Sequence, residues 1–152
     1  MAVTEFPKKV IFVDDEQFIN IWVVDFLESE GYEVVSIENV EDAILEIEKG
    51  VGRAIIIDLQ VPVADGLKKN VEEEGKVFSR FPGLFLAKLA RNKGFRDRQV
   101  IIYSVHENEE VSSIAKDKLN CTYLLKERPD VFSAELLSVL EYDPTDKVVS
   151  SD

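Results

Sequence analysis

Five apolar runs, each suited to one buried strand, alternate with segments of helical periodicity along this 152-residue chain. The runs lie at Lys9–Val13, Glu33–Ile37, Arg53–Ile57, Gln99–Tyr103 and Cys121–Leu125. Strands that alternate with helices pair in parallel, because each helix returns the chain to the same end of the sheet. Almost uninterrupted apolar strands are typical of sheets covered on both faces. The sequence therefore predicts an α/β fold, a doubly wound five-stranded parallel sheet with helices on both faces.

The segment after Asn39 has the clearest helical pattern. Its apolar residues recur at i, i+3, i+4 and i+7, which places them on one face of a helix, with acidic residues outside that face. The apolar positions are Val40, Ala43, Ile44 and Ile47, and the acidic ones are Glu41, Asp42, Glu46 and Glu48.

Three further helices are predicted from weaker signals. The first runs from Glu16 to Glu30 and ends at Gly31, a residue that can adopt the left-handed conformation of a helix C-cap. Its inward residues are predicted to be Phe18, Ile21, Trp22 and Phe26. Asn108 is predicted to cap a short helix, Ala134–Tyr142 to form the last one, and residues 143–152 to form a polar tail. The predicted domain therefore spans residues 1–142.

One interval is too long for a simple crossover. About 40 residues separate Asp58 from the strand at Gln99, whereas a helix with two short loops needs roughly 15–25. We interpret Leu67–Gly83 as an insertion between the third strand and the third helix, with helix resuming at Leu84. Its aromatic end has two interpretations: it packs on the third helix, or it offers an apolar contact to a partner or a second copy. The residues concerned are Phe78, Phe81 and Pro82.

Composition excludes several classes of protein. A formal net charge of −12 disfavours direct binding to the phosphate backbone of nucleic acid. The single cysteine, Cys121, rules out an internal disulfide framework and is interpreted as a small core residue. The first nine residues lack an apolar signal core, and no apolar stretch approaches the roughly 20 residues of a membrane helix. A soluble cytoplasmic protein with no membrane partner is the expectation.

Acidic residues come directly after two of the predicted strands. Asp14 and Asp15 follow the first strand, and Asp58 follows the third. Because the carboxyl ends of parallel strands meet at one edge of the sheet, these carboxylates should converge there. Their mutual repulsion requires a hard divalent cation, or a phosphoryl group to be transferred, at the same place.

From Lys8 to about Tyr142, apart from the insertion, the chain resembles the receiver domain of two-component response regulators, which has a flavodoxin-like fold. The resemblance rests on four features in the right order at successive strand ends. These are the pair Asp14-Asp15, the run Asp58, Pro62 and Gly66, the hydroxyl of Ser104, and Tyr123-Leu124-Leu125-Lys126.

The resemblance implies a role for each acidic residue. Asp58 would accept a phosphoryl group from the phosphohistidine of a sensor kinase or phosphotransfer protein. Asp15 and Asp58 would hold Mg²⁺ together with the backbone carbonyl of Gln60, and Asp14 would help through water. Mg²⁺ prefers oxygen ligands and would neutralise charge on the phosphoryl oxygens during transfer.

The remaining implied roles concern the response to phosphate. Lys126 would pair with one phosphoryl oxygen, and the hydroxyl of Ser104 would bond another. Tyr123 would be the aromatic switch residue, whose side-chain rotamer changes when Ser104 moves. The Gln60 side chain would line the path by which water reaches the phosphoryl group. The switch would change contacts with a downstream protein target or with a second copy of the chain.

Each of these residues also has a plain structural interpretation. Asp14 and Asp15 could simply cap the first helix. The others could serve as turn, capping, sheet or solvated surface residues: Pro62, Gly66, Ser104, Tyr123 and Lys126. Two residues depart from the family pattern: Glu127, after Lys126, replaces the usual proline, and Val105, after Ser104, replaces a small residue. His106, the only histidine, is given no function.

Two other functions remain open. A degenerate receiver would act as a docking module without phosphorylation. A phosphohydrolase of the haloacid dehalogenase type also uses an aspartate nucleophile, but it has Asp-x-Asp where this chain has adjacent acids followed by Glu16. The preferred interpretation is a signalling domain and not an enzyme, apart from self-phosphorylation by small donors and slow autodephosphorylation. It would be a stand-alone regulator or the first domain of a longer protein.

Overall fold

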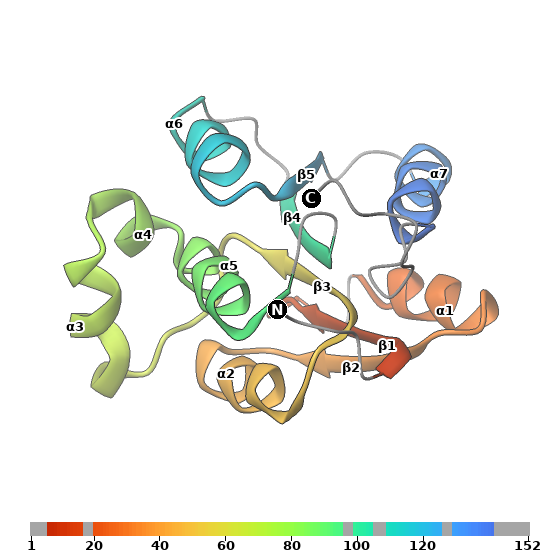
Figure 1. The fold of residues 1–152 in the computed structure, drawn as a ribbon, viewed down its shortest axis with the longest axis horizontal. Coiled ribbons are helices and arrows are strands. Elements are labelled where there is room, and N and C mark those ends of the chain that lie inside the picture. The colour runs from red at the N-terminus through yellow and green to blue at the C-terminus, as the bar shows by residue number, and fades with distance from the viewer. Residues whose placement is uncertain (1–5, 17–19, 96–98, 105–108, 126–128, 142–152) are drawn as a thin grey trace.

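The computed structural model describes residues 6–16, 20–95, 99–104, 109–125 and 129–141. Within these residues the chain forms a central sheet with helices packed on both of its faces (Figure 1). None of the helices in these ranges is long and apolar enough to span a bilayer.

The described strands form one five-stranded parallel sheet in the order β2-β1-β3-β4-β5. They are β1 (Phe6–Val13), β2 (Glu33–Ile37), β3 (Gly52–Asp58), β4 (Val100–Ser104) and β5 (Thr122–Leu125). The order changes direction at β1, because β2 lies on one side of β1 and β3 to β5 follow on the other. Functional sites of open α/β sheets form where the order reverses, at the carboxyl ends of the strands. The predicted fold class is confirmed.

Helices cover both faces of this sheet. The helical segments are α1 (Ile21–Ser29), α2 (Val40–Lys49), α3 (Asp65–Glu73), α4 (Lys76–Arg80), α5 (Pro82–Lys93), α6 (Glu109–Ser113), the π-helical turn η2 (Ile114–Lys118) and α7 (Pro129–Leu140). α1 and α7 share one core cluster with the sheet, and α2, α5 and α6 share the other. Alternate residues of β3 supply the two clusters, with Ile55 and Ile57 on one side and Ala54 and Ile56 on the other. The strand is buried on both faces, as its uninterrupted apolar sequence predicts.

All five strand predictions are correct in place, and the prediction for β2 (Glu33–Ile37) is exact, whereas the other four differ from the structure at one or both ends. β1 begins at Phe6 and not Lys9, since Phe6 still pairs with Gly52. β3 extends to Asp58, which pairs with Tyr103, and β4 and β5 each begin one residue later than predicted. Backbone pairing decides where a strand ends, whereas the apolar run marks only its buried part.

The prediction for the first helix is wrong at its start and at one inward residue. α1 begins at Ile21 and not at Glu16, and its N-cap residue is Asn20, so Asp14 and Asp15 do not cap it. Ile21 is 50 % exposed, because the buried face is formed by Val23, Val24 and Leu27. Phe18 lies outside the described residues.

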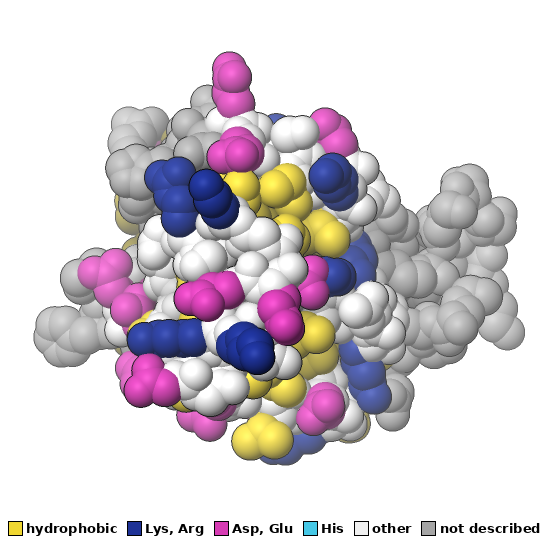
Figure 2. Space-filling model, turned by 90° about the vertical axis from the view of Figure 1, so that its left-hand side faces the viewer, with side chains coloured by type: hydrophobic (Ala, Val, Ile, Leu, Met, Phe, Trp, Pro, Cys, Tyr) yellow, Lys and Arg dark blue, Asp and Glu magenta, His cyan; other side chains and the backbone are white. Residues whose placement is uncertain are grey.

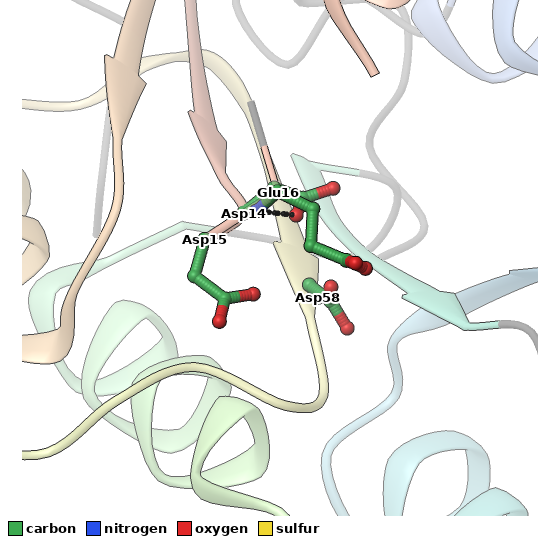
Figure 3. A group of neighbouring side chains, drawn as sticks. All are labelled: Asp14, Asp15, Glu16 and Asp58. Carbon is green, nitrogen blue, oxygen red and sulfur yellow. Dashed lines mark hydrogen bonds between the residues drawn. The ribbon is translucent and has the colours of Figure 1, made fainter. Parts of the chain in front are cut away.

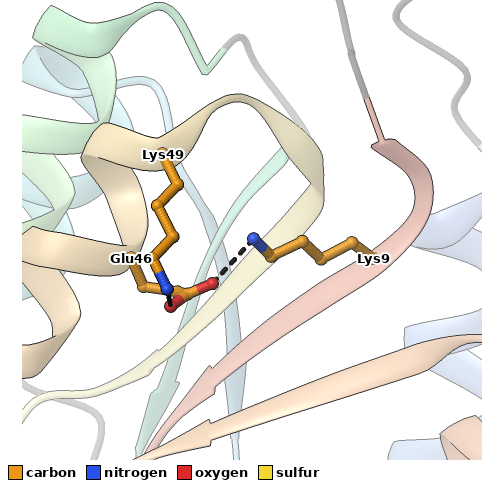
Figure 4. Close-up of polar contacts among 3 residues, drawn as sticks. All are labelled: Lys9, Glu46 and Lys49. Atoms are coloured by element: carbon orange, nitrogen blue, oxygen red, sulfur yellow. Dashed lines mark ion pairs between the residues drawn. The ribbon is translucent and has the colours of Figure 1, made fainter.

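The helix predicted after Asn39 is confirmed as α2, with one correction. Asn39 caps it, since its side chain accepts a hydrogen bond of 2.8 Å from the backbone N–H of Asp42. Glu46, predicted on the outer face, is buried. Its carboxylate binds Lys9 of β1 at 2.7 Å and Lys49 at 3.0 Å (Figure 4). Glu46 can be buried because its charge is paired with these two lysines. The amphipathic pattern of α2 does not reveal the pair with Lys9, which lies on a different element.

The predicted insertion contains α4 and most of α3, which lie on the side of the molecule shown in Figure 2, where charged side chains surround apolar ones. Phe78 and Phe81 are partly buried against the core, which supports the packing interpretation of the aromatic end. Helix resumes at Pro82 and not Leu84, because proline suits the first turn of α5. A cavity of about 240 Å³ remains beside α3, lined by Val61, Val63, Lys68, Val71 and Pro82 among others.

The last helix also differs from its prediction. α7 spans Pro129–Leu140 and not Ala134–Tyr142, because proline at its first position favours an earlier start. Cys121 is buried, as predicted, although it precedes β5. Asn108, Tyr142 and the predicted tail lie outside the described residues.

Candidate phosphorylation and metal site

The strand order brings the predicted site residues to one end of the sheet. β1, β3 and β4 are neighbours, and Asp14, Asp58 and Ser104 stand at their carboxyl ends. All three side chains belong to the few buried polar residues, with exposed fractions of 0 %, 5 % and 6 %. Burial of polar groups at the end of a sheet indicates a built site and not solvated surface.

Four carboxylates gather at this end. Asp14, Asp15, Glu16 and Asp58 each place one oxygen so that these oxygens lie within 4.8 Å of one another (Figure 3). Two negative charges at such a distance repel by on the order of 3 kcal/mol at an effective dielectric constant near 20. Oxygen donors at this spacing suit a hard divalent cation such as Mg²⁺ or Ca²⁺, which would offset the repulsion. The sequence predicted three of these four residues and did not propose Glu16.

The two buried carboxylates are held in place by backbone amides. The N–H of Glu16 donates to Asp14 Oδ1 at 2.7 Å, and the N–H of Gln60 donates to Asp58 Oδ1 at 3.1 Å. Each bond joins residues two positions apart, so each aspartate fixes the first turn of the loop that follows its strand. The loops after β1 and β3 are therefore shaped by the same carboxylates that would hold the metal.

The Gln60 side chain points toward the inserted segment. Its Nε2 donates to the backbone carbonyl of Arg80 at 3.2 Å. The loop after Asp58 is anchored on its other side by α2, since the N–H of Val40 donates to the carbonyl of Pro62 at 3.0 Å. The segment that carries Gln60 is thus attached to both the helix before β3 and the insertion after it.

The predicted switch residues lie on β4 and β5. Ser104 pairs in register with Leu125. Tyr123 is partly buried on the face covered by α2, α5 and α6, and the Nζ of Lys116 lies 5.9 Å from the centroid of its ring. Lys126, together with Val105, His106 and Glu127, lies outside the described residues.

Sequence reasoning missed two buried residues that contact this site. Asn20 Nδ2 donates to Asp14 Oδ2 at 2.8 Å, and the hydroxyl of Tyr103 donates to Asn20 Oδ1 at 3.1 Å. Burial raises the pKa of Tyr103 far above its usual value, and the negative charges of Asp14, Asp58 and Glu16 raise it further. The only sequence signal for Tyr103 was a phenol in an otherwise apolar strand, next to Ser104.

Comparison with known structures identifies the class of this fold. A two-component response regulator from Clostridium difficile superposes with a TM-score of 0.67 at 17% identity, over 94% of this chain and 99% of that one. The receiver domain of the sensor histidine kinase PA1611 from Pseudomonas aeruginosa, with magnesium in its active-site cleft, gives 0.58 at 20% identity, over 91% and 98%. The beryllofluoride-activated NtrC4 receiver domain dimer gives 0.63 at 20% identity, over 88% and 97%.

The chain therefore has the fold of CheY-like response regulator receiver domains, which confirms the resemblance seen in the sequence. No protein-family model matches the sequence.

Proposed function

We propose that this protein is a phosphoacceptor signalling domain in which Asp58 receives a phosphoryl group from a sensor histidine kinase or phosphotransfer protein. The observation that carries the proposal is the gathering of Asp14, Asp15, Glu16 and Asp58 at the switch point of a receiver fold. The receiver domains that share this fold include one from a histidine kinase and one that forms a dimer, which supports a kinase partner and a second copy of the chain as candidates.

The chemistry follows from the position of Asp58. A carboxylate oxygen of Asp58 would attack phosphorus while the phosphorus–nitrogen bond of the donor histidine breaks, which leaves an acyl phosphate on Asp58. Asp15, Asp58 and the backbone carbonyl of Gln60 would hold Mg²⁺, and Asp14 would act through water. The bound cation would supply neutralisation of the charge on the phosphoryl oxygens.

The response would start at Ser104 and Lys126. The Ser104 hydroxyl would donate to one phosphoryl oxygen, and the ammonium of Lys126 would pair with another. Tyr123, next to β4 in the sheet, would follow the movement of Ser104 and alter the surface around α6 and α7. A downstream protein in the cytoplasm would read that surface, with no direct role for nucleic acid or a membrane.

Mass spectrometry after incubation with acetyl phosphate and Mg²⁺ tests the proposal. Wild type should gain one phosphoryl group in a hydroxylamine-labile form, and Asp58→Asn should gain none. Asp25→Asn, an exposed carboxylate on α1, is the matched control and should behave as wild type. A wild-type chain that accepts phosphate from neither a small donor nor a kinase would favour the docking-module alternative. Continuous release of phosphate from many substrates would favour the phosphohydrolase.

A further inference from the structure

A buried chain of hydrogen bonds leads from the metal site into the core between the sheet and α7. We propose that Asn20 and Tyr103 are positioning residues that hold the carboxylate of Asp14 in the orientation needed for the cation. The inference deepens the proposed function and rests on it. Tyr103 belongs to β4, Asn20 caps α1, and Asp14 follows β1, so three separate elements meet in this chain of bonds.

The direction of each hydrogen bond is fixed by the carboxylate. An ionised carboxylate only accepts, so Asn20 must turn its amide nitrogen toward Asp14 Oδ2, at 2.8 Å. The carbonyl oxygen of the same amide then faces Tyr103, whose hydroxyl must donate to it, at 3.1 Å. All three side chains are less than one-tenth exposed, so a missing partner would leave a buried polar group unsatisfied.

Both oxygens of Asp14 are therefore engaged from the protein side. Oδ1 accepts from the backbone of Glu16, and Oδ2 accepts from Asn20. The carboxylate cannot turn without breaking one of these bonds. Partners that orient a ligand in this way commonly change metal affinity by tenfold or more when they are removed. Tyr103 acts one step further away, through Asn20.

The same tyrosine connects the site to α7 and α1. The Tyr103 ring lies 4.9 Å from the ring of Phe132 on α7, and Phe132 packs edge-on against Trp22 of α1 at 5.7 Å. Trp22 is the only tryptophan in the chain. Binding of a cation beside Asp14 should consequently be sensed at Trp22 through the contacts of Asn20, Tyr103 and Phe132, and the fluorescence of Trp22 offers a direct readout.

The test is a Mg²⁺ titration of the full chain, followed by Trp22 fluorescence and independently by calorimetry. Tyr103→Phe removes only the hydroxyl and keeps the ring packing, so the fold should persist. Its Kd for Mg²⁺ should rise about three- to tenfold, and that of Asn20→Ala about tenfold or more. Tyr32→Phe is the matched control, since Tyr32 lies before β2 at the opposite end of the sheet, and its Kd should equal that of wild type.

The outcomes separate the two levels of the proposal. If wild type binds Mg²⁺ and Tyr103→Phe binds it equally well, the hydrogen bonds are only structural and the positioning inference is overturned. A lower melting temperature of Tyr103→Phe without Mg²⁺, with unchanged Kd, would overturn it in the same way. If wild type itself binds no Mg²⁺, the metal site of the proposed function fails together with the inference.

Discussion

The backbone of Gly83, at the start of α5, is pressed against the carbonyl oxygen of Asp58 at the end of β3. A methyl group added at Gly83 would overlap that oxygen and lie 2.8 Å from the Cα of Leu59. The N–H of Gly83 donates to the carbonyl of Leu59 at 3.0 Å. The helix that follows the insertion is thus docked directly on the strand end that carries the proposed phosphoacceptor.

Gly83→Ala should destabilise the protein, because the Cβ would meet backbone atoms that cannot move aside. We expect a loss of about 1–3 kcal/mol in the free energy of unfolding, measured by urea denaturation. Gly66→Ala is the matched control: the space around Gly66 in α3 is open, and alanine should stabilise that helix by about 0.5–1 kcal/mol. Equal effects of the two substitutions would contradict the close approach at Gly83.

Mg²⁺ should raise the melting temperature, because it relieves repulsion among carboxylates that the unfolded chain does not hold together. At ten times the Kd the gain is about 1.4 kcal/mol, which corresponds to about 3–6 °C for a domain of this size. Asp15→Asn should lose most of this shift, and Asp25→Asn, an exposed carboxylate on α1, should keep it. A full shift in Asp15→Asn would remove Asp15 from the site.

Glu46→Gln should destabilise the fold at neutral pH, because it leaves the buried end of Lys9 facing an amide. A loss of about 1–3 kcal/mol is expected from urea denaturation. Hydrogen bonding to Lys9 is the main cause that holds the pKa of Glu46 below its ordinary value of 4.5, and Lys49 lowers it further. Burial alone would raise that pKa.

The pH dependence of this effect has a definite sign. A carboxyl whose pKa is lowered by folding stabilises the fold above its unfolded pKa, and that stability disappears as pH falls through the folded pKa. The difference between wild type and Glu46→Gln should thus be complete above about pH 5.5 and shrink below pH 4.5, as Glu46 becomes neutral. Glu48→Gln, exposed on the same helix, should show almost no difference at either pH.

Cys121 should be unreactive in the folded protein. Burial raises the pKa of its thiol to about 11, although Arg91 acts in the opposite direction. At pH 8 about one thiol in a thousand would be ionised, and the reactive species is the thiolate. Ellman's reagent should therefore label Cys121 only after denaturation. Labelling of the native protein within minutes would show that the segment before β5 opens readily.

Much of the fold could be predicted because it depends on order along the chain. The apolar runs at Arg53–Ile57 and Gln99–Tyr103 have the length of buried strands, and intervening helices make such strands parallel. Parallel pairing then brings Asp14 and Asp58 to the same end of the sheet, whatever the details of the helices. The helix after Asn39 was equally predictable, since its cap and its apolar face are local.

The features that could not be predicted depend on contacts between distant residues. Asn20 and Tyr103 are 83 positions apart, and only the tertiary fold brings the N-cap residue of α1 to β4, where the amide and the phenol meet. Glu46 looks like a solvated helix residue until Lys9 of β1 is placed beside it.

The sequence by itself determined the parallel sheet and its acidic end. Hydrophobic periodicity is a local property, and the alternation of strands and helices can be followed directly along the chain. The tertiary structure alone decided that Gly83 touches the Asp58 backbone and that Asn20 and Tyr103 orient Asp14. These contacts depend on how closely the helices and strands approach one another. That distance is set by side-chain packing across the whole core, and a local sequence pattern does not reveal it.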